Sequence, residues 1–156
     1  MGFLRSLIGF LGRALLSLIF IASGLHKLLN WSASEQFLIQ GINECLGMSV
    51  GHGWIQEWLE IALQNVYALL ATATAVELAC GLMIFLGVSA RFGALILFLY
   101  LIPTTAVFHH FWMLQGVERE LQSIMFLKNI AIMGGLLVLV AYGRGGCCEP
   151  KTESTA

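Results

Sequence analysis

Long apolar runs separated by short polar breaks make up most of the chain. Each run holds roughly the 20 residues that an α-helix needs to cross the hydrocarbon core of a bilayer. The runs extend over residues 7–29, 61–86, 92–112 and 121–142. This pattern predicts an all-α fold, a four-helix transmembrane bundle in one domain over residues 1–146, with a short cytoplasmic tail at 147–156. The first run is longer than the apolar part of a signal peptide, about 7–15 residues, which favours a retained span.

The segment between the first two runs mixes apolar and acidic residues. Ser34, followed by Glu35 and Gln36, is typical of a helix start, and a Gly-rich stretch at 41–53 is expected to break the chain. Four later residues have the spacing of one apolar helical face: Trp54, Ile55, Trp58 and Leu59. We expect a short amphipathic, outward-facing segment that lies on the membrane surface. A lid over a pocket between the helices is the alternative.

Composition excludes several classes of function. The chain is 58% hydrophobic and only 11% charged, whereas a soluble domain carries about 25% charged residues. So few charges exclude a water-soluble enzyme and a disordered chain. The net charge of -1 provides no basic surface for nucleic acid. A small multi-pass membrane protein, with the lipid bilayer as its environment, remains.

The distribution of Lys and Arg predicts the orientation of the chain in the membrane. Segment 28–60 contains neither residue, whereas basic residues flank the other side of the runs: Arg5, Arg13, Arg91, Arg144 and Lys151. Because positively charged loops stay in the cytoplasm, we expect both termini to be cytoplasmic and segment 28–60 to face outward. All four tryptophans then lie near the outward ends of the spans, where an aromatic belt belongs.

Ionisable residues inside the apolar runs need partners, because each charge at the bilayer centre costs about 2.5–3.5 kcal/mol on insertion scales. We expect an intramembrane polar site formed by Arg13, Glu77, Lys128 and Asn129. In it, Glu77 pairs with Arg13, or as second choice with Lys128. Such a pair either holds the helices together or forms a site for a headgroup or a proton. Small residues mark where helices approach closely, among them Gly24, Gly81, Gly134 and Gly135.

A second polar group is expected at the outward ends of the spans, formed by His26, Lys27, His109 and His110. Adjacent helical residues point about 100° apart, so His109 and His110 do not face one metal, and no metal site is expected. The histidines are either interfacial side chains or groups that titrate near physiological pH. Cys147 and Cys148, in the tail, are either exposed thiols or a site of acylation or redox chemistry.

Several stretches resemble the DoxX family. RALLSLIFIASGLHKL, from Arg13, is similar to the opening helix of that family, and ELACGLMIFLGVSAR, from Glu77, to its second-helix motif. FHHFW, from Phe108, and KNIA, from Lys128, resemble later parts. The resemblance implies a four-helix inner-membrane protein. The family takes its name from a small subunit of an archaeal thiosulfate:quinone oxidoreductase, and a distant eukaryotic branch acts in receptor assembly.

Two functional hypotheses follow from the residues and the resemblance. The first is a membrane subunit or accessory of a quinone-linked oxidoreductase system, not self-sufficient as an enzyme, that binds a quinone near Glu77, Lys128 and a histidine. The second is a non-catalytic membrane partner or assembly factor. A transporter ranks last, because four helices without a repeat are poorly suited to alternating access. A soluble or membrane redox partner and an oligomer are both compatible with the sequence.

Overall fold

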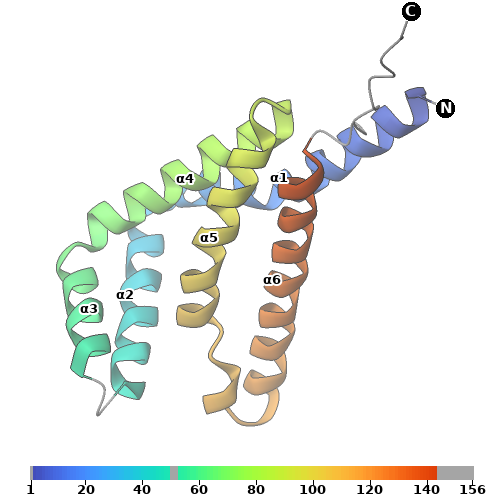
Figure 1. The fold of residues 1–156 in the computed structure, drawn as a ribbon. Coiled ribbons are helices and arrows are strands. Elements are labelled where there is room, and N and C mark those ends of the chain that lie inside the picture. The colour runs from blue at the N-terminus through green and yellow to red at the C-terminus, as the bar shows by residue number, and fades with distance from the viewer. Residues whose placement is uncertain (1, 50–52, 144–156) are drawn as a thin grey trace, which may run out of the picture.

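The computed structural model describes residues 2–49 and 53–143. These residues form helices and no strand, which confirms the all-α prediction. The elements are α1 (Gly2–Leu29), α2 (Trp31–Met48), α3 (Gly53–Gln64), α4 (Val66–Leu86), α5 (Ala90–Phe108), the 3-10 turn η1 (Phe111–Met113) and α6 (Gly116–Tyr142) (Figure 1). Four segments are long and apolar enough to span a membrane: Ser6–Leu29, Val66–Leu86, Ala90–Met113 and Gly116–Tyr142.

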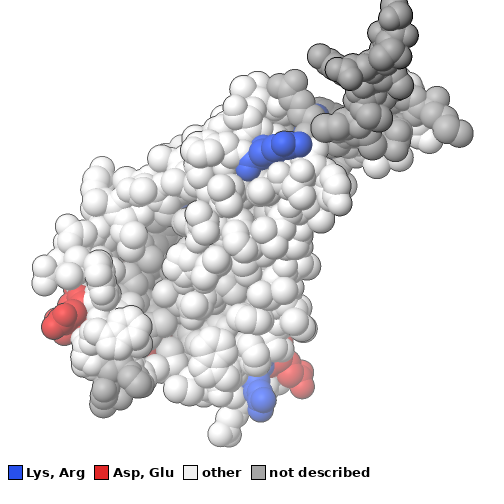
Figure 2. Space-filling view, viewed as in Figure 1, with Lys and Arg blue, Asp and Glu red and all other residues white. Residues whose placement is uncertain are grey.

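Each membrane-spanning helix packs mainly on the next spanning helix along the chain. The most extensive contacts join α1 to α4, α5 to α6 and α4 to α5. The start of α1, the α4–α5 turn and the end of α6 lie at one end of the bundle, while the α2–α3 hairpin and η1 lie at the other (Figure 1). In the space-filling view, charged side chains gather toward these two ends and leave an uncharged band between them (Figure 2). An uncharged band flanked by charges is the surface expected of a membrane protein.

The expected break at 41–53 is wrong for its first half, because α2 continues without interruption to Met48. Gly41 lies inside α2 and permits close packing rather than a turn. A Cβ atom at Gly41 would come within 2.5 Å of the Phe108 ring. Phe37, one turn earlier, stacks on the same ring with centroids 5.1 Å apart. The glycine therefore holds α2 against the end of α5.

The second span starts later than the apolar run predicts. The run begins at Ile61, but α3 ends at Gln64 and α4 starts at Val66. Asn65, between them, leaves the helical conformation with φ -118° and ψ 27°, and its side chain donates to the carbonyl of Ile61. Apolar residues on both sides of such a polar hinge read as one run in the sequence, although they belong to two helices.

Side chains from all four spans meet in the core. Ile84 of α4, Leu97 of α5 and Leu136 of α6 are fully buried, and Phe20 of α1 is 4% exposed. Close approach of α1 and α4 depends on two glycines. A Cβ at Gly24 would lie 2.7 Å from Leu78, and one at Gly81 would lie 2.9 Å from Ile21. This contact brings Lys27, one turn after Gly24, beside α4.

The orientation in the membrane is tested with cysteines placed in the two exposed ends. Glu57 of α3 and Val88 of the α4–α5 turn are both exposed. The two variants are made in a background without Cys45, Cys147 and Cys148. We expect Glu57→Cys to react with a membrane-impermeant thiol reagent in intact cells and Val88→Cys to react only after lysis. The reason is that basic residues gather on the side of the membrane where Val88 lies, which predicts that this side is cytoplasmic. The reverse labelling pattern would contradict the predicted orientation.

Candidate functional site

Glu77 lies at the centre of a buried polar cluster that joins three spans. Its side chain is 6% exposed, and the carboxylate accepts hydrogen bonds from Lys27 Nζ of α1 at 2.6 and 2.8 Å. The hydroxyl of Tyr100 on α5 donates to the same carboxylate at 2.8 Å. Lys27 also donates to Ser23 Oγ at 2.8 Å. We name this group the Lys27 cluster: Ser23, Lys27, Glu77 and Tyr100. Such cross-linking between helices satisfies charges that cannot face lipid.

The expected pairing of Glu77 with Arg13 is wrong. Gly24, not Arg13, lies opposite Glu77, since a Cβ at Gly24 would lie 3.4 Å from the Glu77 Cβ. Arg13 lies eleven residues before Gly24 on α1, about 16 Å away at 1.5 Å per residue. Its guanidinium lies against the α4–α5 turn, where a Cβ at Gly87 would be 3.5 Å from the Arg13 Cζ. Arg13 therefore belongs to the other end of the α1–α4 contact.

The second choice, Lys128, is also wrong as a partner of Glu77. Lys128 is exposed, and its Nζ contacts the sulfur of Met125 on its own helix at 3.3 Å. Its neighbour Asn129 points inward instead, where its amide donates to Thr105 Oγ1 of α5 at 3.1 Å. The four residues of the expected intramembrane site thus lie in separate places.

The expected outward cluster also divides. Lys27 turns inward to Glu77, while His26 is exposed. His109 bonds through Nδ1 to the Gln122 side-chain oxygen at 2.7 Å. His110 is 7% exposed and lies 3.6 Å from Glu44 of α2 through Nε2. In the described part of the chain, no group of three His, Cys, Asp or Glu residues is placed to hold a metal.

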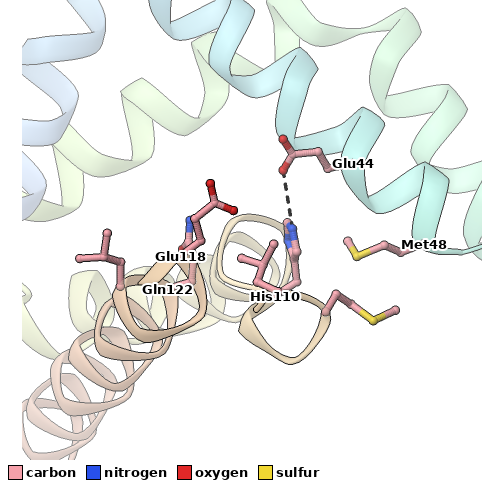
Figure 3. Close-up of a pocket in the computed structure, with 8 residues that line it drawn as sticks. Glu44, Met48, His110, Glu118 and Gln122 are labelled. Carbon is pink, nitrogen blue, oxygen red and sulfur yellow. Dashed lines mark ion pairs between the residues drawn. The ribbon is translucent and has the colours of Figure 1, made fainter. Parts of the chain in front are cut away.

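A pocket of about 540 Å³ opens beside His110. It lies between the end of α2 on one side and η1 with the start of α6 on the other, and Figure 3 shows His110 turned toward Glu44 across it. We name it the His110 pocket. Its lining combines ionisable, amide and apolar side chains: Glu44, Met48, His110, Met113, Leu114, Glu118, Leu121 and Gln122. Neither this pocket nor a smaller one at the α4–α5 turn is lined by α3, so the lid alternative for that helix gains no support.

One backbone carbonyl fixes two residues beside the His110 pocket. The oxygen of Val107 is 3.1 Å from His110 Nδ1 and accepts a hydrogen bond from the Cys45 thiol at 3.3 Å. Burial raises the pKa of the Cys45 thiol, and the neighbouring charge of Glu44 raises it further, so the thiol stays protonated and keeps donating. This carbonyl therefore links α2 to the end of α5. Cys147 and Cys148 lie outside the described residues.

The family model of DoxX matches residues 8–110. The chain belongs to the DoxX family. It is also 27% identical over 109 residues to inner membrane protein YphA of Escherichia coli strain K12, an alignment that covers 70% of this chain and 76% of that protein. No solved structure matches the chain. The DoxX match includes the whole Lys27 cluster and ends at His110, so that α6 lies beyond it.

Sequence reasoning missed the Lys27–Glu77 pair and the role of Tyr100. Lys27 closes the first apolar run, which favours an interfacial lysine rather than a buried one. The two glycines at the α1–α4 contact contained the missing signal. If Gly24 and Gly81 mark where antiparallel helices touch, residue 27 lies near residue 77 rather than near the outward end of the second span, where that span starts.

Proposed function

We propose that this DoxX protein is a membrane subunit or accessory of a quinone-linked oxidoreductase system, and that the His110 pocket receives the quinone headgroup. The observation that carries the proposal is the composition of this pocket. It places a buried histidine beside a carboxylate, next to apolar walls, at the end of a transmembrane bundle. Its volume, about 540 Å³, falls in the range of small-molecule sites, about 300–1,000 Å³.

The side chains of the pocket fit both the polar carbonyl groups and the apolar ring of a quinone. The carbonyl oxygens of a quinone accept hydrogen bonds, and the Gln122 amide can donate one. His110 can donate one from Nε2 when its ring carries both protons, because Nδ1 already faces the Val107 carbonyl at 3.1 Å. Since the Gln122 oxygen is occupied by His109 at 2.7 Å, its NH₂ group is the part left to donate. Met48, Met113, Leu114 and Leu121 provide apolar surface for the ring. This arrangement replaces the expected site near Glu77 and Lys128, because Glu77 is enclosed by its partners and Lys128 points away.

A bound quinone would supply the redox chemistry, and this chain would supply binding and proton handling. His110 and Glu44 are both groups that can carry a proton, and His110 Nε2 lies 3.6 Å from a Glu44 carboxylate oxygen. Glu44 is about half exposed, with 47% of its side chain accessible, so it connects the buried ring to water. The electron donor in this proposal belongs to a partner protein.

The test is to measure quinone in the purified protein and its affinity for a short-chain quinone. We expect the lipid extract of the wild-type protein to contain quinone, and His110→Ala to weaken binding about tenfold through loss of a buried hydrogen bond. His26→Ala is the matched control, because His26 is exposed and lines neither described pocket. Equal affinity of wild type and His110→Ala would refute the proposed site.

The non-catalytic alternative rests on α3. This helix contains no buried residue, and Trp54 and Trp58 are 68% and 69% exposed. Such a face suits the membrane interface or a partner protein. If the wild-type protein binds no quinone and a soluble partner is retained only while both tryptophans are present, the assembly role replaces the redox role.

A further inference from the structure

Lys128 places a charge on the outside of the bundle within a membrane-spanning helix. It lies twelve residues after the start of α6 at Gly116 and fourteen before its end at Tyr142, about 18 and 21 Å along the helix axis. Glu120, the last charged residue before it, is eight residues earlier, about 12 Å away. The backbone of Lys128 therefore lies well inside the membrane-spanning helix.

The bundle itself does little to stabilise this charge. The side chain is exposed, and in the described part of the chain its hydrogen-bond partner is the sulfur of Met125 at 3.3 Å. A thioether is a weak acceptor. A charged side chain in this position normally pairs with an opposite charge or faces a polar cavity. Lys27, by comparison, binds the Glu77 carboxylate and the Ser23 hydroxyl, and its side chain is only 21% exposed.

Lys128 lies at the edge of an exposed apolar face of α6, next to Ala131 one turn later and about 120° around the helix from Gly134. Met133 and Leu136 are the buried residues of α6. Only 11% of the residues in its apolar stretch are buried, so most of this helix faces outward from the bundle. Gly134 faces open space, because a Cβ atom added there would meet nothing within 4 Å. Its exposed neighbours on the same face of α6 are small or branched apolar residues: Leu127, Ala131, Val138 and Ala141. Small residues let helix backbones approach closely in membranes.

We propose that this face of α6 binds a transmembrane helix of a different protein, one that carries an Asp or Glu at the depth of Lys128. The inference concerns a partner of the system proposed above, but it rests on Lys128 and not on quinone binding. A carboxylate gives the ammonium the ion pair that the described part of this chain does not, and the open backbone at Gly134 allows the partner helix to come near.

A second copy of this chain does not meet the requirement. Copies inserted with the same orientation present each residue at the same depth. Glu77 is the acidic residue within the first three candidate spans, and it is 4% exposed and held by Lys27. Glu118 and Glu120 lie in the first two turns of α6, above Lys128 in depth. The charge complementarity therefore favours a partner with its own intramembrane acid.

The experiment uses the full-length protein in phosphatidylcholine vesicles with synthetic single-span peptides. One Leu/Ala peptide carries a Glu two turns below its outer end, and the matched control peptide carries Gln there. Energy transfer between labelled protein and labelled peptide reports binding at pH 8. We expect the wild type to bind the Glu peptide about threefold or more tightly than the Gln peptide. Lys128→Met is expected to remove this preference, and Lys128→Arg to retain it.

Three results would overturn the proposal. The first is equal binding of both peptides by wild type. The second is Lys128-dependent energy transfer between copies of the protein, which would assign the face to a homodimer. The third is loss of the preference when phosphatidylglycerol is added, which would mean that the ammonium reaches lipid headgroups. His110→Ala is expected to leave the preference unchanged, so failure of the quinone proposal is distinguishable from failure of this one.

Discussion

Replacing Glu77 with Gln is expected to destabilise the protein by about 3–5 kcal/mol, because the ammonium of Lys27 is then buried without a counter-charge. Lys27→Met should cost about as much, since it leaves the carboxylate unpaired. The double variant should recover part of the loss. The amide oxygen that replaces the carboxylate in it still accepts the hydrogen bond that Tyr100 gives to Glu77 at 2.8 Å. The measurement is the midpoint of SDS-induced unfolding in mixed micelles.

The control for the Glu77 series is Glu60→Gln. Glu60 is an exposed residue of α3, and a surface substitution of this kind changes stability by about 0.5 kcal/mol or less. If Glu77→Gln unfolds at the same SDS concentration as wild type, the ion pair does not hold the helices together. A double variant that is less stable than both single variants would also contradict the pairing of Lys27 with Glu77.

Replacing Gly24 with Leu is expected to be the second most damaging change. A Cβ there would lie 2.7 Å from Leu78 Cγ and 3.4 Å from Glu77 Cβ, so the larger side chain must push α1 away from α4. Overpacking of this kind costs about 1–3 kcal/mol, and the displacement also draws Lys27 away from its carboxylate. We expect lower stability in the SDS titration and less folded protein in the membrane.

Gly12→Leu is the matched control on the same helix. A Cβ at Gly12 meets nothing within 4 Å, and Leu forms helices better than Gly by about 1 kcal/mol. We therefore expect Gly12→Leu to be neutral or slightly stabilising. Equal losses in both variants would show that the damage comes from glycine replacement in α1 generally and not from the contact with α4.

The sequence was sufficient for the parts of the fold that depend on hydrophobicity alone. Four apolar runs predict four spans, because chain length and bilayer thickness leave little choice. The contact glycines Gly24 and Gly81 were also predicted correctly, since only small side chains allow such an approach. Gly134 was not, because its open face points away from the bundle. A small residue indicates that something comes near without indicating whether it belongs to the same chain.

The candidate site was harder to predict because it depends on the relative shift of helices. The charge at Glu77 signals that a cation is near, but depth estimates from run ends are accurate to a turn or two. Arg13 and Lys27 are both on α1, fourteen residues apart. The shift of α1 along its axis relative to α4 decides which of the two lies beside Glu77. That shift follows from packing around Gly24 and Gly81, and the sequence contains these glycines without stating which residue of the other helix each one meets.

The order of the Lys27 cluster along the chain has a consequence for biosynthesis. Lys27, Glu77 and Tyr100 belong to α1, α4 and α5, all of which leave the ribosome before α6. The charges of Lys27 and Glu77 are therefore placed to neutralise each other while the last helix is still being made, since protein segments fold in the order of their synthesis. The last helix then joins a bundle whose ion pair is already complete, and it adds mainly the apolar contacts of Met133 and Leu136.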